Sequence, residues 1–307
     1  MEKEIRHVIK ADQFTKESLE EIFILADDMV ANPDKYSESL KKKIVATLFY
    51  EPSTRTRLSF ETAALQLGAG LISTENAGTA SSEVKGETIK DTIEVTAGYA
   101  DAIVMRHPNV DSAEIAARVS SVPILNAGSG SGEHPTQALL DVYTIKQVKE
   151  DLNNLKVAVS GDLKHGRTIH SLIKLLSLYD NTTIYGLSRA FFRLPQKYID
   201  YLIESEAKYI PVSQFEELPN DLDILYHTRT QLERFKNEAT GVIDEYIINN
   251  DVMKSFSNQT YVMHPLPRVK EISEDFDNDP RAIYIKQAHN GVPIRKALLL
   301  KSINHSY

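Results

Sequence analysis

The stretch EPSTRTR at residues 51–57 determines how the rest of the chain is interpreted. The run before it, residues 43–49, is β-branched and apolar, which is typical of a buried parallel strand. The segment after it, residues 58–67, has apolar side chains at helical spacing and ends at Gly68. We therefore predict that residues 51–57 form a strand-to-helix turn.

This turn is rich in groups that bind anions. A helix begins with free backbone N–H groups at the positive end of its dipole, and this one adds three hydroxyls alternating with two guanidinium groups. The alternative is a plain helix cap with solvated arginines, but a cap needs only one hydroxyl. No Gly-Lys-Ser/Thr follows, and there is no Gly-x-Gly-x-x-Gly turn, so neither common nucleotide loop is present. The predicted phosphate-binding residues are Ser53, Thr54, Arg55 and Thr56.

Composition limits the class of protein. The chain has 307 residues, of which 42% are hydrophobic and 25% charged, and this predicts a globular protein of one large or two medium domains. A net charge of −8 argues against nucleic acid or an anionic membrane as the main partner. The absence of cysteine excludes disulfides, thiolate metal ligands and a cysteine nucleophile. Residues 1–6 lack an apolar signal core and no run is long enough to span a bilayer, so we expect a cytoplasmic protein.

Strand and helix patterns alternate along both halves of the chain. Strands are expected at 43–49, 70–73, 102–105, 123–126, 155–160, 182–186, 222–226 and 261–263, and helices at 16–30, 58–67, 87–99, 138–148, 167–179, 195–205 and 292–300. The sequence 151–154 breaks the pattern. This predicts an α/β fold with two doubly wound parallel sheets, in domains that meet at about residue 150.

Positive or polar side chains follow several of these strands. Arg106 follows one strand, His134 and Gln137 follow a glycine-rich turn at 127–133 that we expect to be flexible, and Arg167 and Arg229 follow strands in the second half. Each alone could be a surface or structural residue. Ligands of open α/β sheets bind at the carboxyl ends of the strands, so we expect these side chains to face a common ligand.

A long polar loop, residues 76–88, carries a single cation, Lys85. Such loops are either solvated surface or functional. Arginines, a lysine, a histidine and backbone N–H groups without a carboxylate pair or metal-ligand spacing suit a multiply anionic ligand and the polarisation of a carbonyl beside a phosphate. Glycoside hydrolysis and zinc chemistry do not fit. We therefore predict no metal and no cofactor.

Three motifs in combination resemble the transcarbamylase family, whose members use aspartate or ornithine. They are STRTR with FE at 53–57 and 60–61, HPTQ at 134–137 and HPLPR at 264–268. The resemblance extends from about residue 7 to residue 300 and is strongest to the members that carbamoylate L-aspartate in pyrimidine biosynthesis. It implies a carbamoyl-phosphate domain at 1–150, on which the last helix at 287–307 packs back, an aspartate domain at 151–286, and bridging helices.

The resemblance also implies a role for each matching residue. Ser53, Thr54, Arg55 and Thr56 would hold the phosphate. Thr56, Arg106 and His134 would polarise the carbamoyl oxygen. The carbamoyl nitrogen would be held by Gln137 and the segment Pro265, Leu266 and Pro267. The carboxylates of aspartate would be bound by Lys85, Arg167, Thr168, Arg229 and Gln231. The catalytic set would be Arg55, Thr56, Lys85, Arg106 and His134.

The family also implies an assembly. Its catalytic unit is a homotrimer with shared active sites, in which Ser81 and Lys85 of one chain enter the site of its neighbour, and some members bind regulatory chains. The loop often carries two successive lysines, and here Val84 replaces the first.

Two alternatives stay open at this stage. An ornithine transcarbamylase usually has His-Cys-Leu-Pro in place of residues 264–267, and this chain has no cysteine. A non-catalytic anion sensor would not need Arg55, Arg106 and His134 together.

Overall fold

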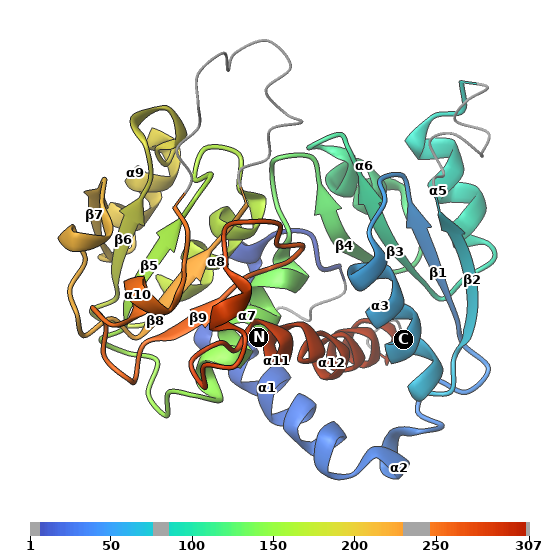
Figure 1. Cartoon of the computed structure of the whole chain (residues 1–307). Coiled ribbons are helices and arrows are strands. Elements are labelled where there is room, and N and C mark those ends of the chain that lie inside the picture. The colour runs from blue at the N-terminus through green and yellow to red at the C-terminus, as the bar shows by residue number, and fades with distance from the viewer. Residues whose placement is uncertain (1–6, 76–85, 230–245, 305–307) are drawn as a thin grey trace. The chain divides into compact units, whose positions relative to one another are not determined.

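The computed structural model of the chain describes residues 7–75, 86–229 and 246–304 (Figure 1). They form two compact units. The first consists of residues 1–143 and 290–307, and the second of residues 144–289. No helix within the described ranges combines the length and the apolar character needed to cross a membrane.

The first unit is built on a parallel sheet of four strands. These are β1 (Ile44–Phe49), β2 (Gly70–Glu75), β3 (Ala102–His107) and β4 (Ile124–Ser129), in the order β2-β1-β3-β4. Strands β3 and β4 are buried almost throughout because helices cover the sheet, and this explains their continuous apolar character. The four strands predicted for this half of the chain are confirmed.

Helices of the first unit come from both ends of the chain. They are α1 (Lys16–Ala31), α2 (Pro33–Tyr36), α3 (Thr54–Gln66), α5 (Ile89–Ala97), α6 (Ser112–Val119), α7 (Pro135–Lys146), which continues into the second unit, α12 (Gly291–Asn304), and the 3-10 turn η1 (Ala11–Gln13). The Thr15 hydroxyl caps α1 by accepting from the Ser18 amide at 3.3 Å. Helix α12 packs against α3 and α1.

The second unit has a parallel sheet of five strands. These are β5 (Lys156–Ser160), β6 (Thr183–Leu187), β7 (Lys208–Val212), β8 (Ile224–His227) and β9 (Tyr261–Met263), in the order β7-β6-β5-β8-β9. Its helices are α8 (Arg167–Leu176), α9 (Gln196–Glu204), α10 (Asn250–Met253) and α11 (Tyr284–His289), with the 3-10 turns η3 (Ala190–Phe192), η4 (Phe215–Glu217) and η6 (Glu274–Phe276). The predicted parallel α/β class is therefore confirmed for both units.

The glycine-rich segment 127–133 differs from its prediction as a flexible turn. Residues 127–129 belong to the buried strand β4, and the Ser129 amide donates to the Glu133 carbonyl at 3.1 Å, which closes the turn. Gly130 has a φ of +47°, and a Cβ there would lie 2.6 Å from the Pro108 carbonyl oxygen. The glycines therefore serve close backbone packing rather than mobility.

Candidate functional site

Each sheet has one point where the strand order reverses. In the first unit, β2 lies on one side of β1 and β3 on the other, and in the second unit β6 and β8 flank β5 in the same way. At such a point the connections leave in opposite directions, so that a crevice opens beyond the carboxyl ends of the two central strands. The turn 51–57, Arg167 and Arg229 come after central strands, whereas His134 and Gln137 come after the edge strand β4 and residues 265–267 after the edge strand β9.

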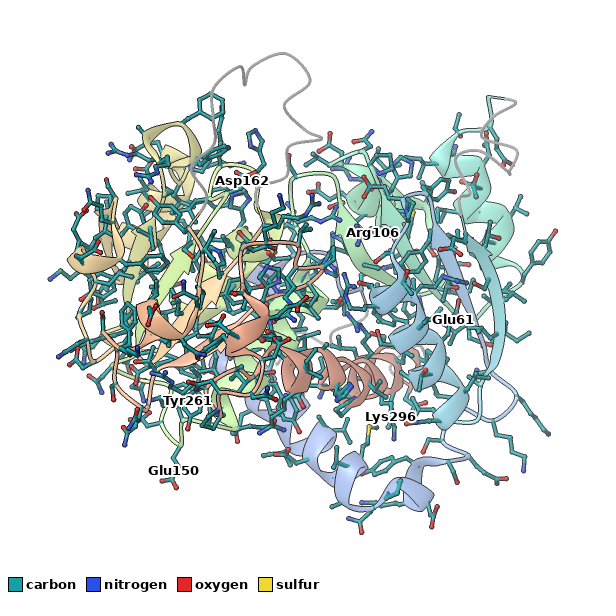
Figure 2. All side chains as sticks on the ribbon, viewed as in Figure 1. Glu61, Arg106, Glu150, Asp162, Tyr261 and Lys296 are labelled. Atoms are coloured by element: carbon teal, nitrogen blue, oxygen red, sulfur yellow. The ribbon has the colours of Figure 1, made fainter. Side chains whose placement is uncertain are left out.

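In the first unit, the carboxyl ends of β1 and β3 bring the turn 51–57 to Arg106. Phe49 pairs with Arg106, and the Tyr50 amide donates to the Arg106 carbonyl at 2.9 Å. The Arg106 side chain donates from Nη1 to the Ser53 hydroxyl at 3.0 Å, and its Nε lies 3.5 Å from Glu51 Oε2. Arg106 lies inside β3 rather than just after it, so the strand itself fixes its position (Figure 2).

The two arginines of the turn have different environments. Arg57 is paired with Glu75 at 2.9 Å and with Glu61 at 3.4 Å, and this joins α3 to β2. Arg55 is exposed at the first turn of α3, while Thr56 next to it is buried. Because Arg57 is held in ion pairs, Arg55 is the cation of this turn that is better placed to meet a ligand.

The first turn of α3 is supported from below by α12. The Ser59 hydroxyl lies 2.6 Å from the Arg55 carbonyl oxygen and 3.0 Å from that of Thr56. Arg295 of α12 donates to the Ser59 hydroxyl, and its guanidinium lies 4.9 Å from the centroid of the Phe60 ring. Burial lowers the pKa of Arg295 to about 9, so it stays charged at neutral pH. The buried positive charge of Arg295 therefore lies next to the predicted anion-binding turn, to which it is linked through Ser59.

The start of α7 carries His134 and Gln137. His134 is buried, and Gln137 donates from Nε2 to Asp141 Oδ1 at 2.9 Å, one turn along the helix. This bond sets the orientation of the Gln137 amide, because the nitrogen must face Asp141. The amide oxygen then points elsewhere and can accept a hydrogen bond.

In the second unit, Arg167 and Arg229 lie beyond the carboxyl ends of the equivalent strands β5 and β8. The Thr228 amide donates to the Ser160 carbonyl at 3.0 Å, which joins the ends of the two strands. Arg167, the first residue of α8, is buried with 5% of its surface exposed, whereas Thr168 and Arg229 are half-buried. Asp162 is fully buried in the turn between β5 and α8 and accepts from the His165 amide at 2.9 Å.

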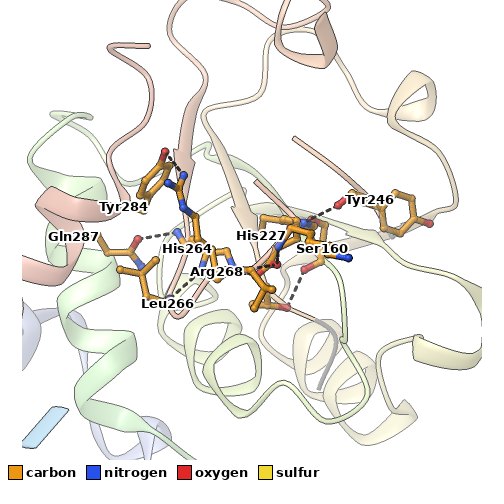
Figure 3. A network of polar contacts seen from close by, with 12 residues as sticks. Ser160, His227, Tyr246, His264, Leu266, Arg268, Tyr284 and Gln287 are labelled. Atoms are coloured by element: carbon orange, nitrogen blue, oxygen red, sulfur yellow. Dashed lines mark hydrogen bonds and ion pairs between the residues drawn. The ribbon is translucent and has the colours of Figure 1, made fainter. Parts of the chain in front are cut away.

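The segment 264–268 follows β9, next to β8. Pro265 and Leu266 are half-buried and Pro267 is exposed. The Leu266 amide donates to Nδ1 of His264 at 2.8 Å, and the His264 amide donates to Gln287 Oε1 at 2.8 Å (Figure 3). The backbone of this segment is thus held by side chains rather than by a strand ladder.

The remaining predicted site residues, Ser81, Lys85 and Gln231, lie outside the described residues. Within the described ranges, no three or more histidine or acidic side chains are grouped so that they could hold a metal ion. Sequence reasoning missed three residues that support the site, Ser59, Glu271 and Arg295. None of them belongs to one of the motifs, and the contact of Ser59 with Arg295 joins segments far apart in the sequence.

Comparison with known proteins covers both units. The family described as aspartate/ornithine carbamoyltransferase, carbamoyl-P binding domain, matches residues 6–147, and the Asp/Orn binding domain of the same family matches residues 153–301. The aspartate carbamoyltransferase catalytic subunit of Clostridium acetobutylicum is 47% identical over 300 residues, which are 96% of this chain and 97% of the relative. That of Finegoldia magna is 44% identical over 298 residues, with the same two coverages.

Solved structures agree with these sequence matches. The catalytic subunit of M. jannaschii aspartate transcarbamoylase has a TM-score of 0.89 and 44% identity, and the match covers 98% of each chain. Aspartate transcarbamoylase from Trypanosoma cruzi, in complex with N-(phosphonacetyl)-L-aspartic acid, has a TM-score of 0.90 and 36% identity, and the match covers 96% of this chain and 95% of that one.

Proposed function

The chain belongs to the aspartate/ornithine carbamoyltransferase family, and we propose here how its residues carry out the reaction of an aspartate carbamoyltransferase. That reaction transfers the carbamoyl group of carbamoyl phosphate to the amine of L-aspartate and yields N-carbamoyl-L-aspartate and phosphate. The likeness to aspartate enzymes over nearly the whole chain carries this assignment. It is supported by Arg167 and Arg229, because guanidinium groups suit the carboxylates of aspartate rather than the ammonium group of ornithine.

Ser53, Thr54, Arg55 and Thr56 hold the phosphate of carbamoyl phosphate. The position of the turn at the N-terminus of α3 supports this role, because free amides and the helix dipole attract a dianion. The contact between Arg106 and Ser53 at 3.0 Å adds a second guanidinium to the same place.

The carbamoyl group is bound at its two ends by different kinds of group. Thr56, Arg106 and His134 donate to the carbonyl oxygen, on which negative charge develops as the amine attacks. Gln137 and the backbone carbonyls of Pro265 and Leu266, beside Pro267, accept from the carbamoyl nitrogen. The orientation that Asp141 imposes on the Gln137 amide supports this role, because it directs the amide oxygen away from Asp141.

The second unit binds aspartate. Arg167, Thr168 and Arg229 hold its two carboxylates, together with Gln231 and Lys85. The burial of Arg167 supports a strong contact, since a guanidinium pairs more tightly with a carboxylate away from water. The chain needs no covalent intermediate. It aligns amine and carbonyl and supplies preset positive charge, and the leaving phosphate takes up the proton of the amine.

A turnover assay tests the substrate assignment. Phosphate release and carbamoyl product are measured with carbamoyl phosphate and either L-aspartate or L-ornithine at equal concentrations. We expect turnover with aspartate and a rate at the level of the enzyme-free control with ornithine. Faster turnover with ornithine would contradict the assignment to aspartate, and no turnover with either amine would favour an anion sensor.

The assembly and the domain limits are part of the same proposal. We assign the carbamoyl-phosphate domain to residues 1–150 with 287–307 and the aspartate domain to residues 151–286, limits that differ by a few residues from those of the two compact units. The protein works in the cytoplasm as a homotrimer, to which regulatory chains can bind, and Ser81 and Lys85 complete the site of the neighbouring chain.

Hybrid trimers test the shared site. Arg55→Ala chains keep the intact loop 76–88 but have a defective phosphate-binding turn 51–57. Lys85→Ala chains keep the intact turn but have a defective loop. When the two variants are mixed and reassembled into hybrid trimers, activity should return at the sites that combine the intact loop of one chain with the intact turn of its neighbour. Verified hybrids with no more activity than the sum of the two variants would show that Lys85 does not act in a neighbour.

A further inference from the structure

We propose that His264 and Glu271 are positioning residues that make the segment 265–267 a surface of hydrogen-bond acceptors only, and that this surface selects the –NH₂ end of the carbamoyl group. The inference rests on the proposed role of the Pro265 and Leu266 carbonyls and adds to it the groups that hold them.

The segment has a single backbone donor. Pro265 and Pro267 have no N–H, so the Leu266 amide is the one donor between residues 265 and 267. That amide is used internally, since it donates to His264 Nδ1 at 2.8 Å. The segment can therefore offer a ligand only carbonyl oxygens, which pair with an N–H group and gain nothing from a methyl group.

The Leu266 backbone would not hold this shape by itself. Its φ of +57° is in the left-handed region, which is unfavourable for a residue with a Cβ because the Cβ lies too close to the carbonyl oxygen that follows it. Such a conformation persists only where the surroundings fix it. The hydrogen bond to His264 Nδ1 is the contact that compensates at this residue, and it also fixes the direction of the neighbouring carbonyls.

Glu271 determines which nitrogen of His264 accepts. Nδ1 must carry a lone pair, because the Leu266 N–H points at it, so the ring proton is on Nε2. Nε2 lies 3.0 Å from Glu271 Oε1, and a carboxylate is an acceptor that stabilises this tautomer. The other carboxylate oxygen accepts from the amides of Val269 at 3.0 Å and Lys270 at 2.9 Å, which closes the loop on itself.

Both ends of the segment are fixed to the rest of the unit. The His264 amide is bound by Gln287, and Arg268 pairs with Asp277 and donates to the Tyr284 hydroxyl at 3.0 Å (Figure 3). His227, whose ring centroid lies 6.3 Å from that of His264, adds no positive charge, because burial lowers its pKa to about 3. Because both ends of the segment are fixed, the orientation of the Leu266 amide depends on which nitrogen of His264 can accept its hydrogen bond.

Two substitutions of His264 distinguish the roles of its two ring nitrogens, Nδ1 and Nε2. The amide oxygen of asparagine takes the place of Nδ1, and the amide nitrogen of glutamine takes the place of Nε2. His264→Asn keeps an acceptor for the Leu266 amide, and His264→Gln loses it. Because His264→Gln leaves the Leu266 amide without its acceptor, we expect it to raise KM for carbamoyl phosphate about tenfold, while His264→Asn stays within about threefold of the wild type.

Specificity is the second readout. For the trimeric enzyme as purified, kcat/KM is measured with carbamoyl phosphate and with acetyl phosphate, in which a methyl replaces the –NH₂. We expect His264→Gln to lower the ratio of kcat/KM for carbamoyl phosphate to kcat/KM for acetyl phosphate by about tenfold. In this variant the Leu266 N–H has lost its acceptor, so the segment no longer favours the –NH₂ group over a methyl group. His289→Gln, the same change at an exposed position of α11, is the control and should leave the ratio unchanged.

The proposal is overturned if His264→Gln equals the wild type in KM and in this ratio, or if both His264 variants lose activity equally while acetyl and carbamoyl phosphate keep their ratio. A readout independent of activity is nitrogen NMR of the histidine rings, with His264→Asn used to assign the signal. The neutral Nε2–H form supports the proposal, and the Nδ1–H form or an imidazolium overturns it. An enzyme with this tautomer but no carbamoylation of aspartate would contradict the proposed function alone.

Discussion

Glu271→Gln is expected to destabilise the second unit by about 3 kcal/mol at pH 7. The substitution keeps the shape of the side chain and removes its charge. Burial acts to raise the pKa of Glu271, but hydrogen bonds from His264 and from backbone amides more than offset this and lower it from 4.5 to about 2. The carboxylate therefore prefers the folded state.

The magnitude and its pH dependence follow from this pKa. A difference of about 2.5 between the unfolded and folded values corresponds to about 3.4 kcal/mol at pH 7. A lowered carboxyl pKa contributes stability that is present above the unfolded value and is lost as the pH falls towards the folded value. At pH 3.5 the contribution should be about 2 kcal/mol.

Urea unfolding followed by far-UV circular dichroism measures this difference. Wild type and Glu271→Gln are compared at pH 7 and at pH 3.5, with the same concentration of sucrose throughout so that the folded state is populated at the lower pH. Glu274→Gln, the same change at an exposed position three residues away, is the control and should stay within about 0.5 kcal/mol of the wild type. The reasoning would be refuted if the free energies of unfolding of the wild type and Glu271→Gln differed by less than 1 kcal/mol at pH 7. It would also be refuted if this difference were not smaller at pH 3.5.

Three further predictions follow from the site and the core. Arg106→Ala should lower kcat by about 10²–10³ with an unchanged circular dichroism spectrum, because it removes a preset donor to the developing charge, and a loss below tenfold would argue against that role. Arg167→Ala should raise KM for aspartate far more than KM for carbamoyl phosphate, and equal changes in a steady-state assay would contradict the division of binding between the units. Phe60→Ala should cost about 3–5 kcal/mol in urea unfolding because Phe60 is fully buried, whereas Leu58→Ala, at a position that is 49% exposed, should cost much less.

Most of the fold could be predicted because each element has a local signal. Apolar runs bounded by turns marked the strands, and Gly68, with a φ of +80°, ends α3 where any other residue would be strained. Helix α6 had no prediction. Its buried face consists of Ser112, Ala113 and Ala116, whose small side chains give a weak periodic pattern even though they pack closely against the sheet.

The site could be predicted only in part, since motifs mark the residues that we propose to face a ligand and not the residues that contact these from other parts of the fold. Ser59 and Arg295 are 236 positions apart in the sequence, and neither belongs to a recognisable pattern. Glu271 is close to its motif, but a glutamate three residues after HPLPR reads as solvated until the structure shows it buried. The prediction of a flexible turn at residues 127–133 was wrong because glycine occurs where backbones pack closely as well as where a chain is mobile.

The division of the chain has a consequence for its biosynthesis. Residues 290–307, which complete the first unit, follow the whole of the second unit in the sequence. At about 5–20 residues per second, a ribosome needs roughly 7–30 s to pass through the residues between them. During that interval the second unit can fold, while α1 and α3 lack the helix that packs against them and present apolar surface to water. A nascent chain is therefore expected to recruit chaperones to its first half and to release them only after residues 290–307 have been synthesised.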